Sequence, residues 1–122
     1  MSETERFEQG RLHFDAGEYF EAHEVWEDQW NEESGARHAF YQAIIQVAVA
    51  LHHARNGNFK GARKLFASAL GYLERGKIDC APVDPERLKD LVLDFELAIG
   101  ARVAGEEKAL PFFTLPLTLV IG

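Results

Sequence analysis

The chain has 122 residues, of which 47% are hydrophobic, so it fits one domain with a core large enough to fold without disulfides or metals. Its formal net charge is −7, which argues against nucleic acid as a main partner because phosphate binding requires a basic surface. Cys80 is the single cysteine, which excludes an intrachain disulfide.

The longest apolar stretch falls well short of the about 18 residues that a membrane span needs, so we expect no membrane insertion. The first ten residues, MSETERFEQG, are acidic and polar and do not resemble a signal peptide. We therefore expect a soluble cytoplasmic protein with one domain over residues 1–122.

Hydrophobic periodicity predicts a first helix over residues 4–16, in which Phe7, Gly10 and Phe14 share one face. Gly17 is placed to end this helix. A second helix is predicted over residues 18–30. Its apolar stripe at helical spacing consists of Tyr19, Ala22, Trp26 and Trp30.

A third helix, over residues 36–55, is apolar almost all round and is expected to be the central, most buried one. Asn58 is a natural N-cap for a fourth helix over residues 59–75. Asp84 followed by Pro85 is a strong start signal for a fifth helix, which runs to about residue 104.

The last segment, residues 105–122, is apolar and contains Pro111 and Pro116, which disfavour a long helix. We expect an extended tail that covers a groove of its own bundle or contacts a second subunit. A homodimer or a protein partner bound through this tail is therefore one hypothesis.

A faint internal repeat has a spacing of 40 residues, because GEYFEA at 17–22 echoes GNFKGA at 57–62. A glycine, an aromatic residue two positions later and a small residue five positions later suit closely packed helical hairpins of the tetratricopeptide type. Two such units are too few for a solenoid. The predicted fold is therefore an all-α, compact bundle of about five helices with tetratricopeptide-like hairpins.

His23 is a polar residue on the second helix's apolar side. On a helical wheel it lies about 60° from Trp26 and about 20° from Trp30. Glu27, four residues later, stacks one turn along the same side. Glu24 points about 100° away, towards the edge of the buried stripe.

The third helix also carries a polar line, since Gln42, Gln46 and His53 fall within about 40° of one another. An unsatisfied buried polar group costs roughly 1–3 kcal/mol, so we expect the two lines to meet. His23, Glu27 and these three side chains would then form one network in the bundle interior or at its mouth.

Three interpretations of this network compete. It is a hydrogen-bonded structural network. Alternatively it is a site for a divalent metal held by His23, Glu27 and His53, as in a metal-dependent hydrolase, although the full metalloprotease and di-iron patterns are missing. The third is a metal-free pocket for a small molecule, or an acid–base site that pairs His23 with Glu24 or Glu27.

These residues resemble the domain-of-unknown-function family 309. The resemblance covers Phe7 to Leu73 and centres on an EAHExxExxW motif that begins at Glu21. It implies a small all-helical bacterial or archaeal protein with no established activity. The family signature falls on Glu21, His23, Glu24, Glu27, Trp30, Gln42, Gln46, Asn58, Gly61 and Ala62.

Two positions depart from the family pattern. Trp26 stands where relatives more often have Leu, and Ala43 stands where they have Gly before the Ile pair. Neither change touches a polar site residue. The candidate binding residues are therefore Glu21, His23, Glu24, Glu27, Trp30, Gln42, Gln46 and His53.

Overall fold

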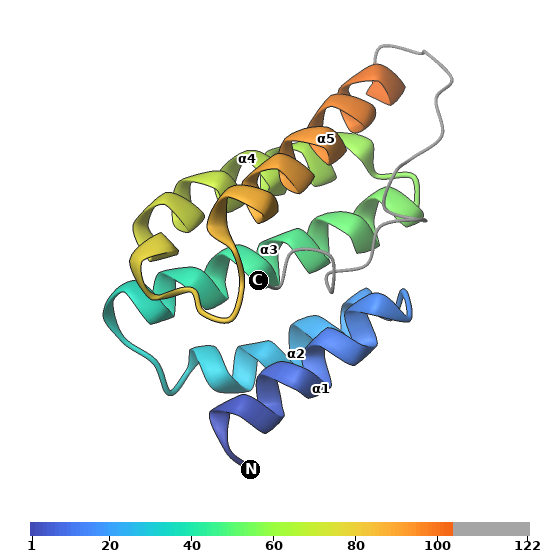
Figure 1. Ribbon diagram of the computed structural model, residues 1–122. Helices are drawn as coiled ribbons and strands as arrows, with labels where there is room; N and C mark the ends of the chain where they lie inside the picture. The colour runs from blue at the N-terminus through green and yellow to red at the C-terminus, as the bar shows by residue number, and fades with distance from the viewer. Residues whose placement is uncertain (104–122) are drawn as a thin grey trace.

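The computed structural model describes the backbone of residues 1–103 and the side chains of residues 1–100 (Figure 1). This part of the chain contains five α-helices, one short 3₁₀ turn at Lys77–Asp79 and no strand. The predicted all-α bundle is therefore confirmed. The helices are α1 (Glu3–Asp15), α2 (Tyr19–Trp30), α3 (Gly35–Arg55), α4 (Phe59–Gly76) and α5 (Pro85–Val103).

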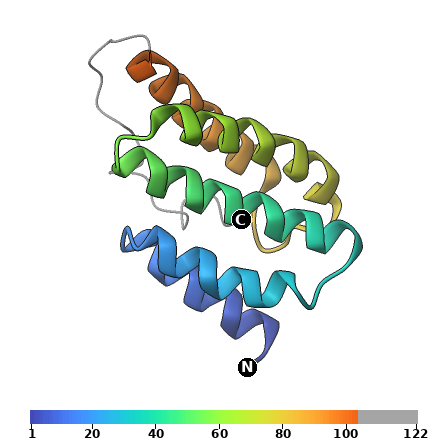
Figure 2. The same cartoon turned by 180° about the vertical axis from the view of Figure 1, so that it is seen from behind.

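The helices form two layers with α3 at the centre. α2 and α4 flank α3, α1 packs on α2, and α5 packs on α4. Figures 1 and 2 show α1 and α5 on the same side of the layer formed by α2, α3 and α4. The prediction that the third helix is central is confirmed, because ten of its side chains are buried.

The predicted helix starts are confirmed by side-chain caps. Asn58 Oδ1 accepts a hydrogen bond from the backbone N–H of Gly61 at 3.0 Å. Asp84 Oδ1 accepts one from the N–H of Glu86 at 3.0 Å. Each cap satisfies an amide that the first turn of a helix leaves without a partner.

The two units of the internal repeat occupy equivalent places in the fold. Gly17 and Gly57 have φ angles of 80° and 82°, a left-handed backbone that glycine adopts without strain, and each leads into a helix. The fully buried residues that follow are Ala22 with Ala62 and Trp26 with Phe66. Stacking of these hairpins as in tetratricopeptide repeats stays a prediction.

Two expectations concern the apolar segments. Segment 105–122 lies outside the described residues, so its extended form and its contacts stay predictions. Within residues 1–103, no helix combines the length and the apolar character that crossing a bilayer requires.

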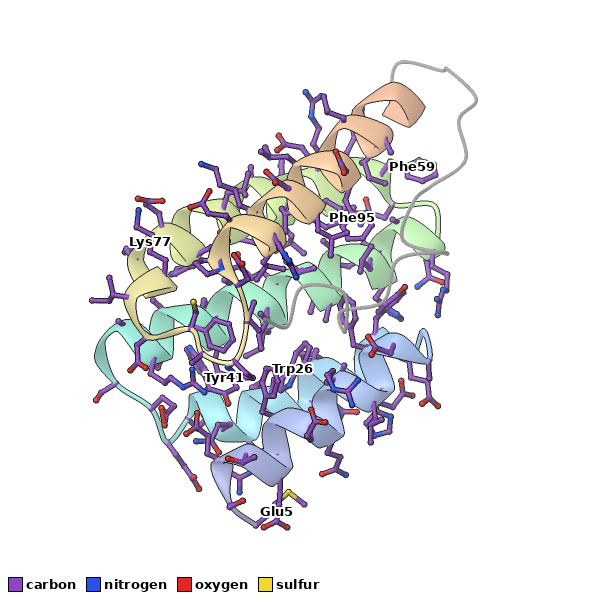
Figure 3. The ribbon with its side chains drawn as sticks, viewed as in Figure 1. Glu5, Trp26, Tyr41, Phe59, Lys77 and Phe95 are labelled. Carbon is purple, nitrogen blue, oxygen red and sulfur yellow. The ribbon has the colours of Figure 1, made fainter. Side chains whose placement is uncertain are left out.

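The core between α1 and α2 is built around the Trp26 indole, which is fully buried (Figure 3). It lies against Gly10 of α1, and the rings of Phe7 and Phe14 pack on it at centroid distances of 6.3 and 5.9 Å. Its N–H donates to the backbone carbonyl of Phe7 at 3.2 Å. Gly10 therefore provides the space that this large ring needs.

A second anchor ties the start of α1 to α3. The fully buried Tyr41 donates its hydroxyl hydrogen to Glu3 Oε1 at 3.2 Å. Arg37 donates to the same oxygen and to the carbonyls of Asp79 and Ala81. Burial raises the pKa of the Tyr41 phenol, and the nearby Glu3 carboxylate raises it further.

We expect Gly10→Ala to lower the free energy of unfolding by about 1–3 kcal/mol, the usual range for overpacking a core. A Cβ atom at Gly10 would lie 2.1 Å from Trp26 Nε1. The matched control is Gly71→Ala in α4, where a Cβ atom would meet nothing within 4 Å. That change should stabilise the chain by up to about 1 kcal/mol through helix propensity. Urea titrations measure both, and equal effects would contradict the packing role of Gly10.

We also expect a loss of stability in alkaline solution that depends on Tyr41. Because the folded state raises the pKa of this phenol, it keeps the proton at a pH where the unfolded chain releases it. The free energy of unfolding should therefore fall as the pH rises above about 10, the ordinary tyrosine value. Urea titrations at pH 7 and 11 should show a smaller loss for Tyr41→Phe than for the unchanged chain. An equal loss of stability in Tyr41→Phe would show that other groups cause the alkaline destabilisation.

Candidate functional site

Aromatic and imidazole rings line the junction of α2 and α3. At one end the Trp30 and His38 rings stack with centroids 4.6 Å apart, and at the other the Phe20 and His52 rings lie 5.6 Å apart. These contacts show that the two helices run antiparallel. We call this surface the α2–α3 seam, defined by Phe20, His23, Glu27, Trp30, His38 and His52.

His23 lies between the two ends of the seam and bonds only with its own helix among the described residues. Its Nδ1 is 2.8 Å from the carbonyl oxygen of Phe20, and its Nε2 is 3.4 Å from Glu27 Oε2. The predicted pairing with Glu27 is thus present. The His23 side chain is 19% exposed, so solvent reaches it. A protonated imidazole could donate to both oxygens at once.

The polar line of α3 does not meet His23 in the part of the chain that the structure describes. Gln42, Gln46 and His53 are half-buried, and no hydrogen bond joins any of them to His23. The side-chain oxygen of Gln46 is buried and has no hydrogen-bond partner among the described residues. These three residues lie on the partly exposed side of α3, whereas its core face consists of Phe40, Ile44, Val47 and Leu51.

The predicted metal ligands His23, Glu27 and His53 do not assemble. Within the described residues, no three His, Cys, Asp or Glu side chains are placed to hold a metal ion together. The pair of His23 and Glu27 supplies two ligands, while protein sites for zinc usually supply three or four. Residues 1–100 therefore offer no geometric support for the metal hypothesis.

The outer face of α2 is strongly acidic. Glu21, Glu24, Glu27 and Asp28 are all exposed, and α2 contains no Lys or Arg. Only Glu27 of these four has an ion-pair partner among the described residues, namely His23. Three carboxylates next to the seam are therefore available to a partner.

Phe20, like His38 and His52, is a seam residue that is not among the candidate residues predicted from the sequence. Its side chain is 48% exposed, although it packs on the His23 ring at 5.0 Å and on His52. A signal was present in the sequence, because Phe20 lies about 100° round the helix from the stripe that begins at Tyr19. An aromatic residue off the buried stripe is expected to face solvent.

A polar cavity of about 460 Å³ lies around Arg37, where α2 ends and α3 begins. No local pattern in the sequence predicts this cavity, since it joins segments far apart in the chain. Its lining residues are Glu3, Glu32, Glu33, Ser34, Arg37, Asp79 and Ala81. The Arg37 guanidinium donates to a carboxylate and two carbonyls already, so its role there is structural.

The comparisons with known proteins agree on one family. The model of the domain of unknown function DUF309 matches residues 7–65. An uncharacterized protein of Bacillus subtilis (strain 168), YpuF, is 36% identical over 78 residues. That alignment covers 62% of this chain and 45% of the relative, so the chain spans less than half of that protein. No solved structure matches significantly.

Both α2 and α3, with the whole seam, lie inside the matched range. The resemblance that the EAHExxExxW motif predicts is thereby confirmed, because residues 7–65 of the chain match the model of the domain of unknown function DUF309.

Proposed function

We propose that the chain is a protein-binding module that uses the α2–α3 seam as its contact surface. The observation that carries this proposal is the exposed Phe20 ring, held between the imidazoles of His23 and His52. Large aromatic side chains held in a fixed place at a surface are typical anchors of protein interfaces.

The seam presents this anchor in a defined position. Phe20 projects from a regular helix, and its ring has neighbours from both α2 and α3. The side chain therefore loses little freedom when a partner covers it, and such preorganisation favours affinity.

The size of the seam suits a short protein segment. Phe20 and Trp30 are ten residues apart on one helix, which corresponds to about 15 Å. About five residues of extended chain cover that length. A segment lying along the junction could contact the Phe20 end and the Trp30 end together.

We expect Phe20→Ala to weaken binding of the partner at least about thirtyfold. The partner should be captured from an extract of the source cells with the purified chain. The Kd of the purified partner for each variant should then be measured. Loss of a central aromatic anchor typically costs 2 kcal/mol or more, which is about a thirtyfold weaker Kd. The matched control is Leu97→Ala on α5, which removes a side chain that is 74% exposed but lies elsewhere.

Comparison of Phe20→Ala with Leu97→Ala tests whether the partner binds at the seam. Both should keep the helical circular dichroism of the unchanged chain, since neither side chain is buried. A partner that binds Phe20→Ala as tightly as the unchanged chain would place the contact surface elsewhere. Failure to recover any partner that distinguishes the two variants, with and without chemical cross-linking, would also overturn the proposal.

A further inference from the structure

Resting on the proposed function of the α2–α3 seam, we propose that its occupant is a positively charged protein segment, and that protonation of His23 and His52 releases it. The α2–α3 seam presents these histidines beside the exposed Phe20 ring and several carboxylates.

The charge of α2 favours a cationic occupant. The exposed face of α2 carries four carboxylates and no basic side chain, in a chain whose net charge is −7. Glu21, Glu24 and Asp28 have no ion-pair or hydrogen-bond partner among the described residues. An acidic surface of this kind attracts cationic segments and repels anionic ones.

The Phe20 ring lies next to two of these carboxylates on α2. Glu24 and Glu27 follow Phe20 by four and seven residues, so the three side chains lie along one side of α2. A Lys or Arg side chain of the partner could lie on the Phe20 ring, with its charge directed towards these carboxylates. Cation–π contact and ion pairing would then act together.

The two histidines beside Phe20 make the charge of the seam depend on pH, because histidine is the side chain that ordinarily changes charge between about pH 5 and 8. The rings of His23 and His52 lie 5.0 and 5.6 Å from the Phe20 ring. A positive charge on either ring would repel a cation placed on Phe20. Protonated His23 would also pair with Glu27, at 3.4 Å, and so neutralise a carboxylate that the partner needs.

The other groups around the His23 and His52 rings do not oppose release of a cationic segment at low pH. The His53 ring lies 6.2 Å from the His52 ring, and its protonation would add a further positive charge. Asn56 Nδ2 lies 3.3 Å from His52 Nε2 and carries no charge. Arg55, three residues along α3, already lies over the Tyr19 ring and donates to the Gly17 carbonyl. Acidification therefore changes the seam from an acceptor of cations to a surface that repels them.

The test uses three fluorescent decapeptides in which leucine alternates with arginine, glutamate or serine. Fluorescence polarisation at 150 mM salt measures their binding at pH 8.0 and 5.5. We expect the arginine peptide to bind at least tenfold more tightly than the other two at pH 8.0. Its affinity should fall at least tenfold at pH 5.5. Equal binding of the three peptides would overturn the inference.

Paired variants separate the seam from the general negative charge of the chain. Glu24→Gln with Glu27→Gln should weaken binding of the arginine peptide at least fivefold. Asp90→Asn with Asp94→Asn removes the same charge from α5 and should change binding less than twofold. Equal losses in the two double variants would show diffuse attraction and contradict a site on α2.

A second pair tests the histidines directly. His23→Gln with His52→Gln should reduce the ratio of the Kd values at pH 5.5 and pH 8.0 from at least tenfold to less than twofold, whatever the affinity at pH 8.0. The control His13→Gln, at the end of α1, should retain the full pH dependence. A pH dependence that survives the double variant would overturn the role of these two rings.

These results are distinguishable from failure of the proposed function. A partner captured through Phe20, together with no preference for the arginine peptide, would overturn this inference and leave the binding module in place. A partner that binds Phe20→Ala as tightly as the unchanged chain would overturn both the proposed function and this inference.

Discussion

The contact between Trp26 and Gly10 is the constraint on which the arrangement of the first three helices depends. The indole is fully buried, and its position requires the absence of a side chain at Gly10. Phe7 contributes both its ring and its carbonyl oxygen, so the polar N–H of the indole is satisfied inside the core. Because the Phe7 ring also packs on Phe40 of α3, the same cluster joins α1, α2 and α3.

This packing fixes which side of α2 faces outward. Trp26 and Ala22 are fully buried on the inner side, so Phe20 and Glu24 must lie on the outer side of the same helix. The outer side also receives His52 from α3, because α2 and α3 run antiparallel and place the end of α3 beside the start of α2. The seam is therefore a consequence of core packing, although none of its exposed residues is needed for that packing.

The helices were predictable from local signals, and so were their ends, because a cap such as Asn58 or Asp84 acts within one turn of its own helix. The relation between helices was harder to predict. A helical wheel gives the side of α3 on which Gln46 lies, but not the neighbour that this side meets. The structure pairs His23 with Glu27 and brings His52, rather than His53, to the Phe20 ring. The Arg37 cavity joins segments far apart in the chain and left no local signal.

The EAHExxExxW motif therefore combines two physical roles that alternate along one helix. Ala22 is fully buried, whereas Glu21 and Glu24 are exposed and make no hydrogen bond or ion pair in the described structure. Exposed carboxylates contribute little to folding, since surface charges are well solvated. His23 is half-buried: it packs on the Phe20 ring and pairs with Glu27, so it is neither a core residue nor a fully exposed one. Because the two roles use different side chains, changes at the seam can alter binding while the Trp26 core keeps α2 in place.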